Sequence, residues 1–281
     1  FAGPGQPTGR EGGVPMLPAL QILWGGVRFF TGAALFSFFE VVAWRLPRGL
    51  SPLRGRSVCP ACGAVLGPAE LVPVASWLAL RGRCRHCGAR IPAWYPAGEL
   101  LGGGAALLAA ARFGGGPLLG LGAEAWLALL LGGVLYAIAR LDAATREIPD
   151  ALNAAVALLG LCRVALLGAR QGGWVPTVLS HGLGVLCVSL PMLVLCLAVP
   201  GAFGGGDIKL MAAAGLFLGW QATLAAFFLA VVSGGGCGFF LLAAGRARRG
   251  DQIAFGPFLC AGIAAALLAG GWLVRRYLAL F

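Results

Sequence analysis

Hydrophobic residues in this chain fall into long runs separated by short polar or glycine-rich breaks. A run of about 20 mostly apolar residues is long enough to cross a bilayer as an α-helix. Eight runs can be counted, and seven is the alternative count because several are short or merge with a neighbour: 17–44, 96–112, 117–140, 148–168, 174–199, 207–219, 221–244 and 253–279. The pattern predicts an all-α polytopic membrane protein with about eight transmembrane helices.

The composition supports this class. Apolar residues make up 59% of the 281 positions, the mean hydropathy is +0.88, and only 11% of residues are charged. A soluble domain usually has about 25% charged residues. The 47 glycines suit close packing of helices in lipid.

One hydrophilic segment, residues 45–92, interrupts the apolar pattern. It contains eight arginines against one acid, Glu70. The chain therefore divides into a flexible tail or expression remnant (1–15), a first transmembrane helix (16–44), this basic loop (45–92) and a transmembrane core (93–281).

The arginines also predict the topology, because basic loops remain in the cytoplasm. The 45–92 loop and the basic loop at 246–249 should both be cytoplasmic. With eight spans, the turns near 141–148 and 200–207 lie on the same side, and both termini lie outside the cytoplasm. Four arginines run against this rule: Arg163, Arg170, Arg275 and Arg276.

Four cysteines in the basic loop form two CxxC pairs, Cys59 with Cys62 and Cys84 with Cys87. Each pair can offer two thiolates to one ion, and two pairs complete a tetrahedral four-sulfur shell. A closed shell of this kind predicts structural Zn²⁺ and a small cytoplasmic zinc-binding domain. The alternative is that the cysteines are unmetallated or disulfide-paired. A basic zinc ribbon can bind nucleic acid, but tethering to eight spans argues against that partner.

Two aspartates stand at the ends of apolar runs, where acids are costly enough to suggest function. Asp142 closes one run, and Asp207 follows Gly204, Gly205 and Gly206 directly before another. The glycines should let the backbone turn sharply beside the acid. On the predicted topology both aspartates lie at the cytoplasmic face. A carboxylate pair that shares one proton can activate water for peptide hydrolysis.

The alternatives for these acids are a helix cap at Asp207 and a membrane boundary at Asp142. No serine–histidine pair competes well: His86 lies inside a CxxC pair, and His181 lies in a span expected to open on the other side. No HExxH zinc-hydrolase motif is present.

Five ordered motifs resemble those of the type IV prepilin peptidases, which are membrane aspartic peptidases of type IV pilus and type II secretion systems. The resemblance extends from about Phe29 to Phe258. The motifs are Phe38–Pro47 at the end of the first span, the two CxxC pairs with Ile91-Pro92 and Tyr95-Pro96, Asp142 with Ile148-Pro149-Asp150, Gly204-x-Gly206-Asp207-x-Lys209-Leu210, and Phe255-Gly256-Pro257-Phe258.

The resemblance implies that Asp142 and Asp207 are the catalytic aspartates. It also implies supporting roles for Gly204 and Gly206, and less directly for Lys209 and Asp150, with Asp150 expected to be structural at the start of a span. The implied substrates are prepilins or pseudopilins, cleaved at the cytoplasmic face of the bacterial inner membrane.

Many members of the family also N-methylate the new terminus with S-adenosylmethionine. This sequence departs from the family pattern in that region, since it has Phe36-Ser37-Phe38-Phe39-Glu40 where Gly-Ser-Phe-Leu-Asn is usual. The departure bears on methylation more than on proteolysis.

Two other classes of function remain as alternatives. A non-catalytic membrane scaffold with a zinc ribbon would leave both aspartates dispensable. A transporter that moves protons or cations would need acids along a path through several spans, whereas most acids here cluster at one face.

Overall fold

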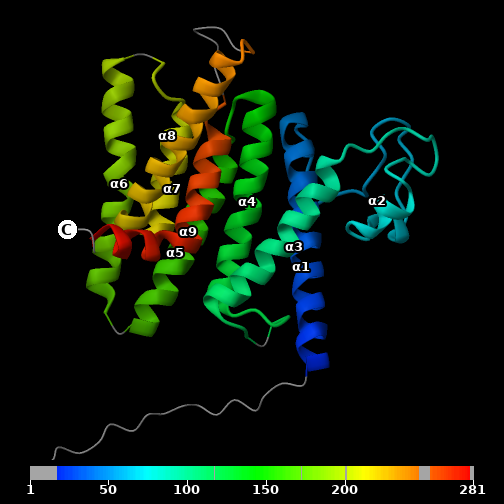
Figure 1. The fold of residues 1–281 in the computed structure, drawn as a ribbon, viewed down its shortest axis with the longest axis horizontal. Helices are drawn as coiled ribbons and strands as arrows, with labels where there is room; N and C mark the ends of the chain where they lie inside the picture. The colour runs from blue at the N-terminus through cyan, green and yellow to red at the C-terminus, as the bar shows by residue number, and fades with distance from the viewer. Residues whose placement is uncertain (1–17, 117, 172, 200, 247–253, 279–281) are drawn as a thin grey trace, which may run out of the picture.

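The computed structural model describes residues 18–116, 118–171, 173–199, 201–246 and 254–278, and over these it is helical with no β-strand (Figure 1). The helices are α1 (Pro18–Arg45), α2 (Ala75–Ala79), α3 (Trp94–Phe113), α4 (Ala123–Thr145), α5 (Asp150–Gln171), α6 (Trp174–Ala198), α7 (Gly205–Leu218), α8 (Trp220–Ala243) and α9 (Gly256–Leu278), with 3₁₀ turns at Leu46–Arg48 and Pro68–Leu71. The all-α prediction is confirmed.

Eight of these helices follow the eight apolar runs, and only the short α2 lies in the hydrophilic segment. Within the described residues, five helices are long and apolar enough to cross a membrane: α1, α4, α5, α6 and α8. The protein is therefore a multi-pass membrane protein. The predicted tail at 1–15 and most of the basic loop at 246–249 lie outside the described residues.

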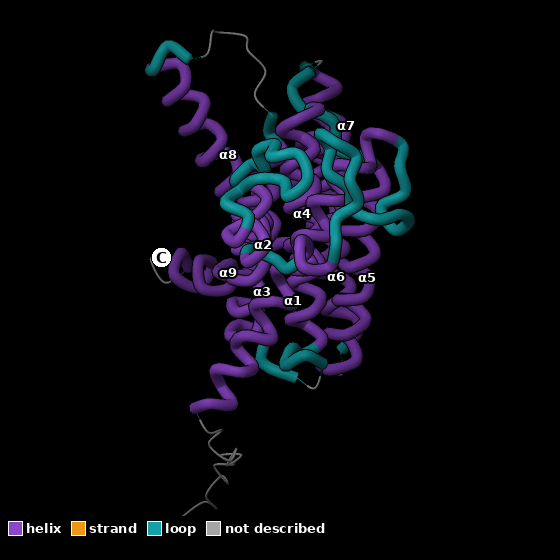
Figure 2. Tube along the Cα trace, turned by 90° about the vertical axis from the view of Figure 1, so that its right-hand side faces the viewer, coloured by secondary structure: helices purple, strands orange, loops and turns teal. Residues whose placement is uncertain are grey.

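The helices pack side by side, and the turns that bear the two aspartates meet at one end of the bundle. α1 packs on α3 and α4, α7 lies against α5 and α6, and α8 packs on α9. Figure 1 shows the turn from α4 to α5 and the loop from α6 to α7 at the same end of the bundle. Figure 2 shows in teal that the chain between α1 and α3 is mostly loop.

Two apolar clusters hold the bundle together. The smaller joins α1, α3 and α4 around Phe36, Ala106 and Leu129. Glycine allows the close approach there, since a Cβ on Gly32 of α1 would overlap the carbonyl of Gly102 on α3.

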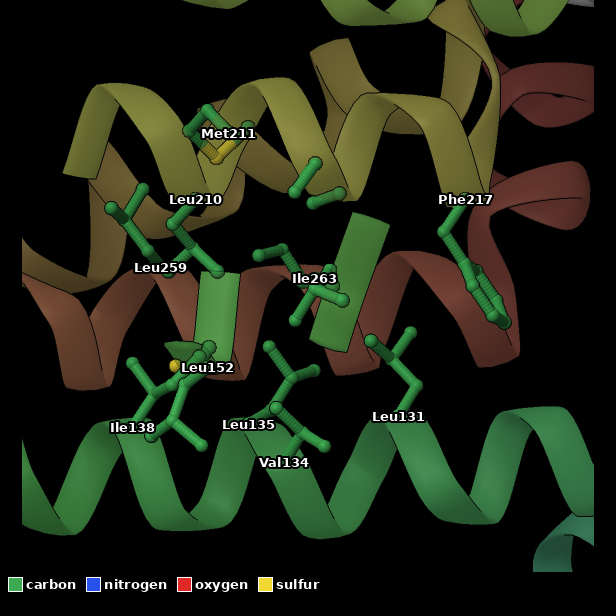
Figure 3. Close-up of a cluster of buried hydrophobic side chains, with 14 of the residues drawn as sticks. Leu131, Val134, Leu135, Ile138, Leu152, Leu210, Met211, Phe217, Leu259 and Ile263 are labelled. Carbon is green, nitrogen blue, oxygen red and sulfur yellow. The ribbon is translucent and has the colours of Figure 1, made fainter. Parts of the chain in front are cut away.

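The larger cluster centres on α4, α5, α7 and α9, and α1, α6 and α8 also contribute buried residues to it (Figure 3). Leu131 and Ile138 of α4 face Leu210 and Phe217 of α7 and Ile263 of α9, and all five are fully buried. A fully buried side chain of this size stabilises a fold by about 1.5–3 kcal/mol in water, although less of this applies to helices packed in lipid. This cluster positions α4 and α7, the two helices that carry the aspartates.

Two of the four arginines that run against the topology rule have specific partners. Arg170 pairs with Glu124 at the start of α4, with 2.7 Å between Nη1 and Oε1. Arg163 points into the bundle, where its Nη1 donates to the carbonyl of Phe217 at 2.6 Å. These partners account for Arg163 and Arg170 at positions outside a cytoplasmic loop. The side chains of Arg275 and Arg276 lie outside the described residues.

Candidate active site and metal centre

Asp142 lies in the last turn of α4 and is only 6% exposed. Its Oδ2 accepts a hydrogen bond from the backbone N–H of Gly256, the first residue of α9, at 2.9 Å. The N-terminus of a helix carries partial positive charge from its free N–H groups. The start of α9 therefore stabilises negative charge on Asp142 and fixes its orientation.

Asp207 lies in the first turn of α7, where Gly204 is the N-cap residue and the Asp207 N–H bonds the Gly204 carbonyl at 3.1 Å. Its side chain is half-buried. Within the described residues, Asp207 Oδ1 is buried and has no hydrogen-bond partner. An unsatisfied carboxyl oxygen is costly and is typical of a functional site.

The two aspartates line one open pocket of about 390 Å³ at the end of the bundle. The sequence predicted that both aspartates lie at the same membrane face, and in the structure they line the same pocket. The remaining lining comes from the turn after α4 and the start of α7: Arg146, Glu147, Ile148, Asp150, Gly204, Gly205 and Gly206.

Lys209 and Asp150 contact each other rather than Asp207. Lys209 Nζ lies 2.8 Å and 3.0 Å from the two carboxylate oxygens of Asp150, the first residue of α5. The side chains are 59% and 73% exposed, respectively. The pair links the starts of α7 and α5 at the rim of the pocket, and the structural role of Asp150 stays a prediction.

The prediction that the glycines before Asp207 allow a sharp backbone turn was wrong. Gly204 has ordinary extended dihedrals, φ −71° and ψ 142°, and the left-handed glycine of this loop is Gly201 at φ 85°. Gly204 and Gly206 instead provide space. A Cβ on Gly204 would lie 3.2 Å from Asp207 Oδ2, and one on Gly206 would lie 3.0 Å from the Cβ of Ile148.

Sequence reasoning missed two residues that hold the pocket. Gly256 was noted only as part of a motif, and its contact with Asp142 was not foreseen. Asn153 of α5 is 6% exposed, and its Nδ2 donates to the carbonyl of Gly206 at 3.4 Å. The available signal was that Asn153 is the one amide or charged side chain between Asp150 and Arg163 in α5.

The four predicted metal ligands come together in the loop between α1 and α3. Their Sγ atoms all lie within 4.8 Å of one another, Cys59 and Cys87 are 4.0 Å apart, and all four cysteines are free rather than disulfide-bonded. Sulfurs around a tetrahedral Zn²⁺ are about 3.8 Å apart. The tetracysteine cluster therefore fits a metal ion of this size.

The two CxxC pairs have the same local structure. In each, the first cysteine N–H bonds a carbonyl five residues later and a glycine adopts positive φ: Cys59 to Ala64 at 2.9 Å with Gly63 at 71°, and Cys84 to Ala89 at 2.8 Å with Gly88 at 72°. The backbone N–H of Cys62 is the main cause that lowers the pKa of the Cys59 thiol to about 7. Such N–H groups stabilise thiolates, the form that binds metal.

Arg45, the last residue of α1, holds the chain that leads into this cluster. Its guanidinium donates to the carbonyls of Ser51 at 3.1 Å, Arg54 at 2.7 Å and Arg56 at 2.9 Å. One arginine thus fastens the loop to the end of the first helix.

Glu40, the residue that departs from the family pattern, is buried with its own partners. It is 6% exposed and accepts hydrogen bonds from Tyr136 Oη at 2.7 Å, and from Arg140 Nε at 3.2 Å and Nη2 at 3.0 Å. The Arg140 guanidinium also lies 5.2 Å from the ring centre of Trp94. The carboxylate is therefore compensated and joins α1 to α4.

This arrangement can activate water between two carboxylates in a pocket that opens at the end of a helical bundle. The metal-binding loop is a separate feature, since none of the four cysteines lines the pocket.

Comparison with known proteins covers both parts of the chain. The family described as "Bacterial Peptidase A24 N-terminal domain" matches residues 30–113, and the "Type IV leader peptidase family" matches residues 129–239. The first match contains the tetracysteine cluster, and the second contains Asp142 and Asp207.

Curated relatives named "Prepilin leader peptidase/N-methyltransferase" are similar over most of the chain. The protein from Bacillus subtilis is 33% identical over 90% of this chain and 97% of its own length. The protein from Burkholderia pseudomallei is 38% identical over 76% of this chain and 67% of its own length. The protein from Klebsiella pneumoniae is 35% identical over 74% of this chain and 91% of its own length. No solved structure matches this chain.

Proposed function

The chain belongs to the type IV leader peptidase family, and we propose that it cleaves the leader peptides of prepilins or pseudopilins with Asp142 and Asp207 as its catalytic pair. The observation that carries this assignment is that carboxylates 65 positions apart, on α4 and α7, line one pocket. Gly204 and Gly206 support the site because, without side chains, they leave room for the first turn of α7, which bears Asp207.

The environments of the two acids suggest their roles. Asp142 receives the N–H of Gly256, so we assign it the ionised state and the role of general base. Asp207 has an oxygen without a donor, so we assign it the proton. Asp142 removes a proton from water, which attacks the scissile carbonyl carbon while protonated Asp207 donates a hydrogen bond to the carbonyl oxygen. The tetrahedral intermediate breaks down when Asp142 passes the proton that it took from water to the leaving nitrogen, the C–N bond breaks and the C=O bond re-forms. Asp142 is then ionised and Asp207 protonated again, ready for the next cycle.

The proposed topology has eight membrane-inserted helices, α1 and α3 to α9, in the bacterial inner membrane with the pocket facing the cytoplasm. Support comes from the 45–92 loop, with its eight arginines, and from the common position of the α4–α5 turn and the α6–α7 loop. The division into a first helix, a zinc-binding loop and a peptidase core follows the same boundaries.

We propose that the tetracysteine cluster binds one structural Zn²⁺. Four sulfur donors favour zinc, and a four-sulfur shell leaves no position open for water or substrate. When bound, the ion would stabilise the fold of the loop, and no step of peptide hydrolysis requires it.

N-methylation is the second activity in the relatives' name, and it stays a prediction from resemblance. Glu40 is buried and accepts three hydrogen bonds from Tyr136 and Arg140, which accounts for its side chain without a cofactor. We assign no residue of this chain to that cofactor.

Substitution of each aspartate by asparagine tests the proposed peptidase site. Asp142→Asn and Asp207→Asn should each abolish cleavage of a test prepilin, because an amide keeps the shape but cannot transfer the proton. Zinc content and thermal unfolding should remain close to wild type. Asp150→Asn serves as the matched control and should retain substantial cleavage. Full activity in either Asp142→Asn or Asp207→Asn would refute the aspartic-peptidase assignment and favour the scaffold alternative.

A further inference from the structure

The helix that carries Asp207 is unusually short for a membrane protein. α7 has 14 residues and rises about 21 Å, whereas the hydrocarbon core of a bilayer is about 30 Å thick. Gly219, at φ 81°, ends α7, and α8 begins at the next residue. On the proposed topology Asp207 lies at one membrane face, so the other end of α7 stops within the membrane.

Such an end leaves carbonyl groups without partners, and lipid cannot supply them. Two side chains from neighbouring helices fill this role. His181 of α6 has its Nδ1 2.8 Å from the carbonyl of Leu216, and Arg163 of α5 donates from Nη1 to the carbonyl of Phe217 at 2.6 Å. Because a carbonyl only accepts, Nδ1 of His181 must carry the proton.

Both side chains are placed specifically for this contact. His181 is 6% exposed, and the Arg163 guanidinium also lies 5.0 Å from the ring centre of Phe217. A cation near the C-terminus of a helix is favourable, because the free carbonyls there carry partial negative charge. Neither residue contributes to the pocket or to the tetracysteine cluster.

The backbone around the same end is packed without free space. A Cβ on Gly215 of α7 would overlap the carbonyl of Gly184 on α6, and a Cβ on Gly160 of α5 would lie 3.0 Å from the backbone nitrogen of Phe217. The C-terminal end of α7 therefore packs closely against α5 and α6 at the glycines, and Arg163 and His181 hydrogen-bond its last carbonyls.

We propose that Arg163 and His181 are positioning residues for the peptidase reaction, which fix the end of α7 and thereby set the height of Asp207 opposite Asp142. A continuous hydrogen-bonded helix transmits a shift at Leu216 to the first turn that bears Asp207. This inference rests on the proposed catalytic role of Asp207. It explains why an arginine and a histidine, both unused by the chemistry, lie in apolar spans.

Two matched pairs of variants test the inference in the full-length protein with a test prepilin. His181→Leu is similar in size but has no hydrogen-bond donor. His181→Asn keeps an N–H donor bonded to Cγ, the same position that Nδ1 has in histidine. Arg163→Met removes the cation, whereas Arg163→Lys keeps it. We expect kcat to fall by about 10- to 100-fold in the Leu and Met variants, with KM within about twofold of wild type. The Asn and Lys variants should recover most of the lost kcat.

Rates are expressed per folded protein, with thermal unfolding and bound zinc as the measures of folding. Wild-type kcat in both His181→Leu and Arg163→Met would overturn the inference, as would losses that appear only in KM or are equal in the conservative variants. If His181→Leu does not fold, the Arg163 pair decides.

Asp207→Asn, assayed in parallel, distinguishes failure of the proposed peptidase function from failure of the positioning role. An active Asp207→Asn refutes the proposed function itself. An inactive Asp207→Asn, together with fully active cap variants, refutes only the positioning role.

Discussion

Replacing Gly256 by alanine tests whether the start of α9 must hold Asp142 for catalysis. The Gly256 N–H donates to Asp142 Oδ2 at 2.9 Å, and the two residues are 114 positions apart. A Cβ on Gly256 would lie 2.6 Å from that oxygen and 2.8 Å from the carboxyl carbon. Because ordinary contacts begin at about 3.4 Å, the carboxylate must move by about 0.8 Å or α9 must shift.

The expected cost can be worked from this geometry. Alanine keeps the backbone N–H, so the added Cβ weakens the hydrogen bond by displacing the carboxylate and does not delete the donor. Complete loss of a hydrogen bond to a charged group costs about 1.5–3 kcal/mol, and each 1.4 kcal/mol corresponds to about tenfold in rate. A displacement of about 1 Å at a reacting group can by itself lower the rate about 100-fold. Gly256→Ala should therefore lower kcat by about 10- to 100-fold, with little change in KM because Gly256 does not line the pocket.

The assay is cleavage of a test prepilin by the reconstituted full-length protein. Gly235→Ala in α8 is the matched control, since a Cβ at Gly235 meets no atom within 4 Å. Thermal unfolding of both variants measures any general loss of stability. A Gly256→Ala protein with wild-type kcat would show that catalysis does not depend on the position in which the start of α9 holds the Asp142 carboxylate, and would refute this reasoning.

Other features of the structure predict further outcomes. The purified protein should contain about one zinc per chain, and serine in place of two cysteines of the tetracysteine cluster should remove the metal and destabilise the loop, as metal analysis and proteolysis would show. Brief chelation of free metal should leave cleavage unchanged, and rapid inhibition would contradict a purely structural ion. Arg140→Met should destabilise the protein by about 1.5–3 kcal/mol, because Glu40 stays buried with only the Tyr136 hydroxyl as partner, whereas adding Glu40→Gln should recover much of that loss in thermal unfolding. Lys209→Met should change stability by no more than about 1 kcal/mol and cleavage by less than about threefold, because its pair with Asp150 is exposed, and a total loss of cleavage would place Lys209 in the chemistry instead.

The sequence alone determined the features that depend on neighbours along the chain. Runs of apolar residues predicted where α1 and α3 to α9 lie, because a helix in lipid needs an apolar surface along its length. The CxxC spacing predicted the tetracysteine cluster, because one turn of backbone brings the two cysteines of each pair close enough to share one ion. The ordered motifs also identified the family before any fold was known.

The tertiary structure decided everything that depends on how one helix faces another. The contact of Gly256 with Asp142, the caps on α7 from Arg163 and His181, and the partners of Glu40 all join residues far apart in the sequence. Helices with similar apolar surfaces can pack in many rotations and registers, so hydropathy does not select their partners. The glycines before Asp207 show the same limit, since they serve the packing of Ile148 and the carboxylate rather than a sharp turn. Only the packed bundle fixes the heights and orientations from which the two aspartates face one pocket.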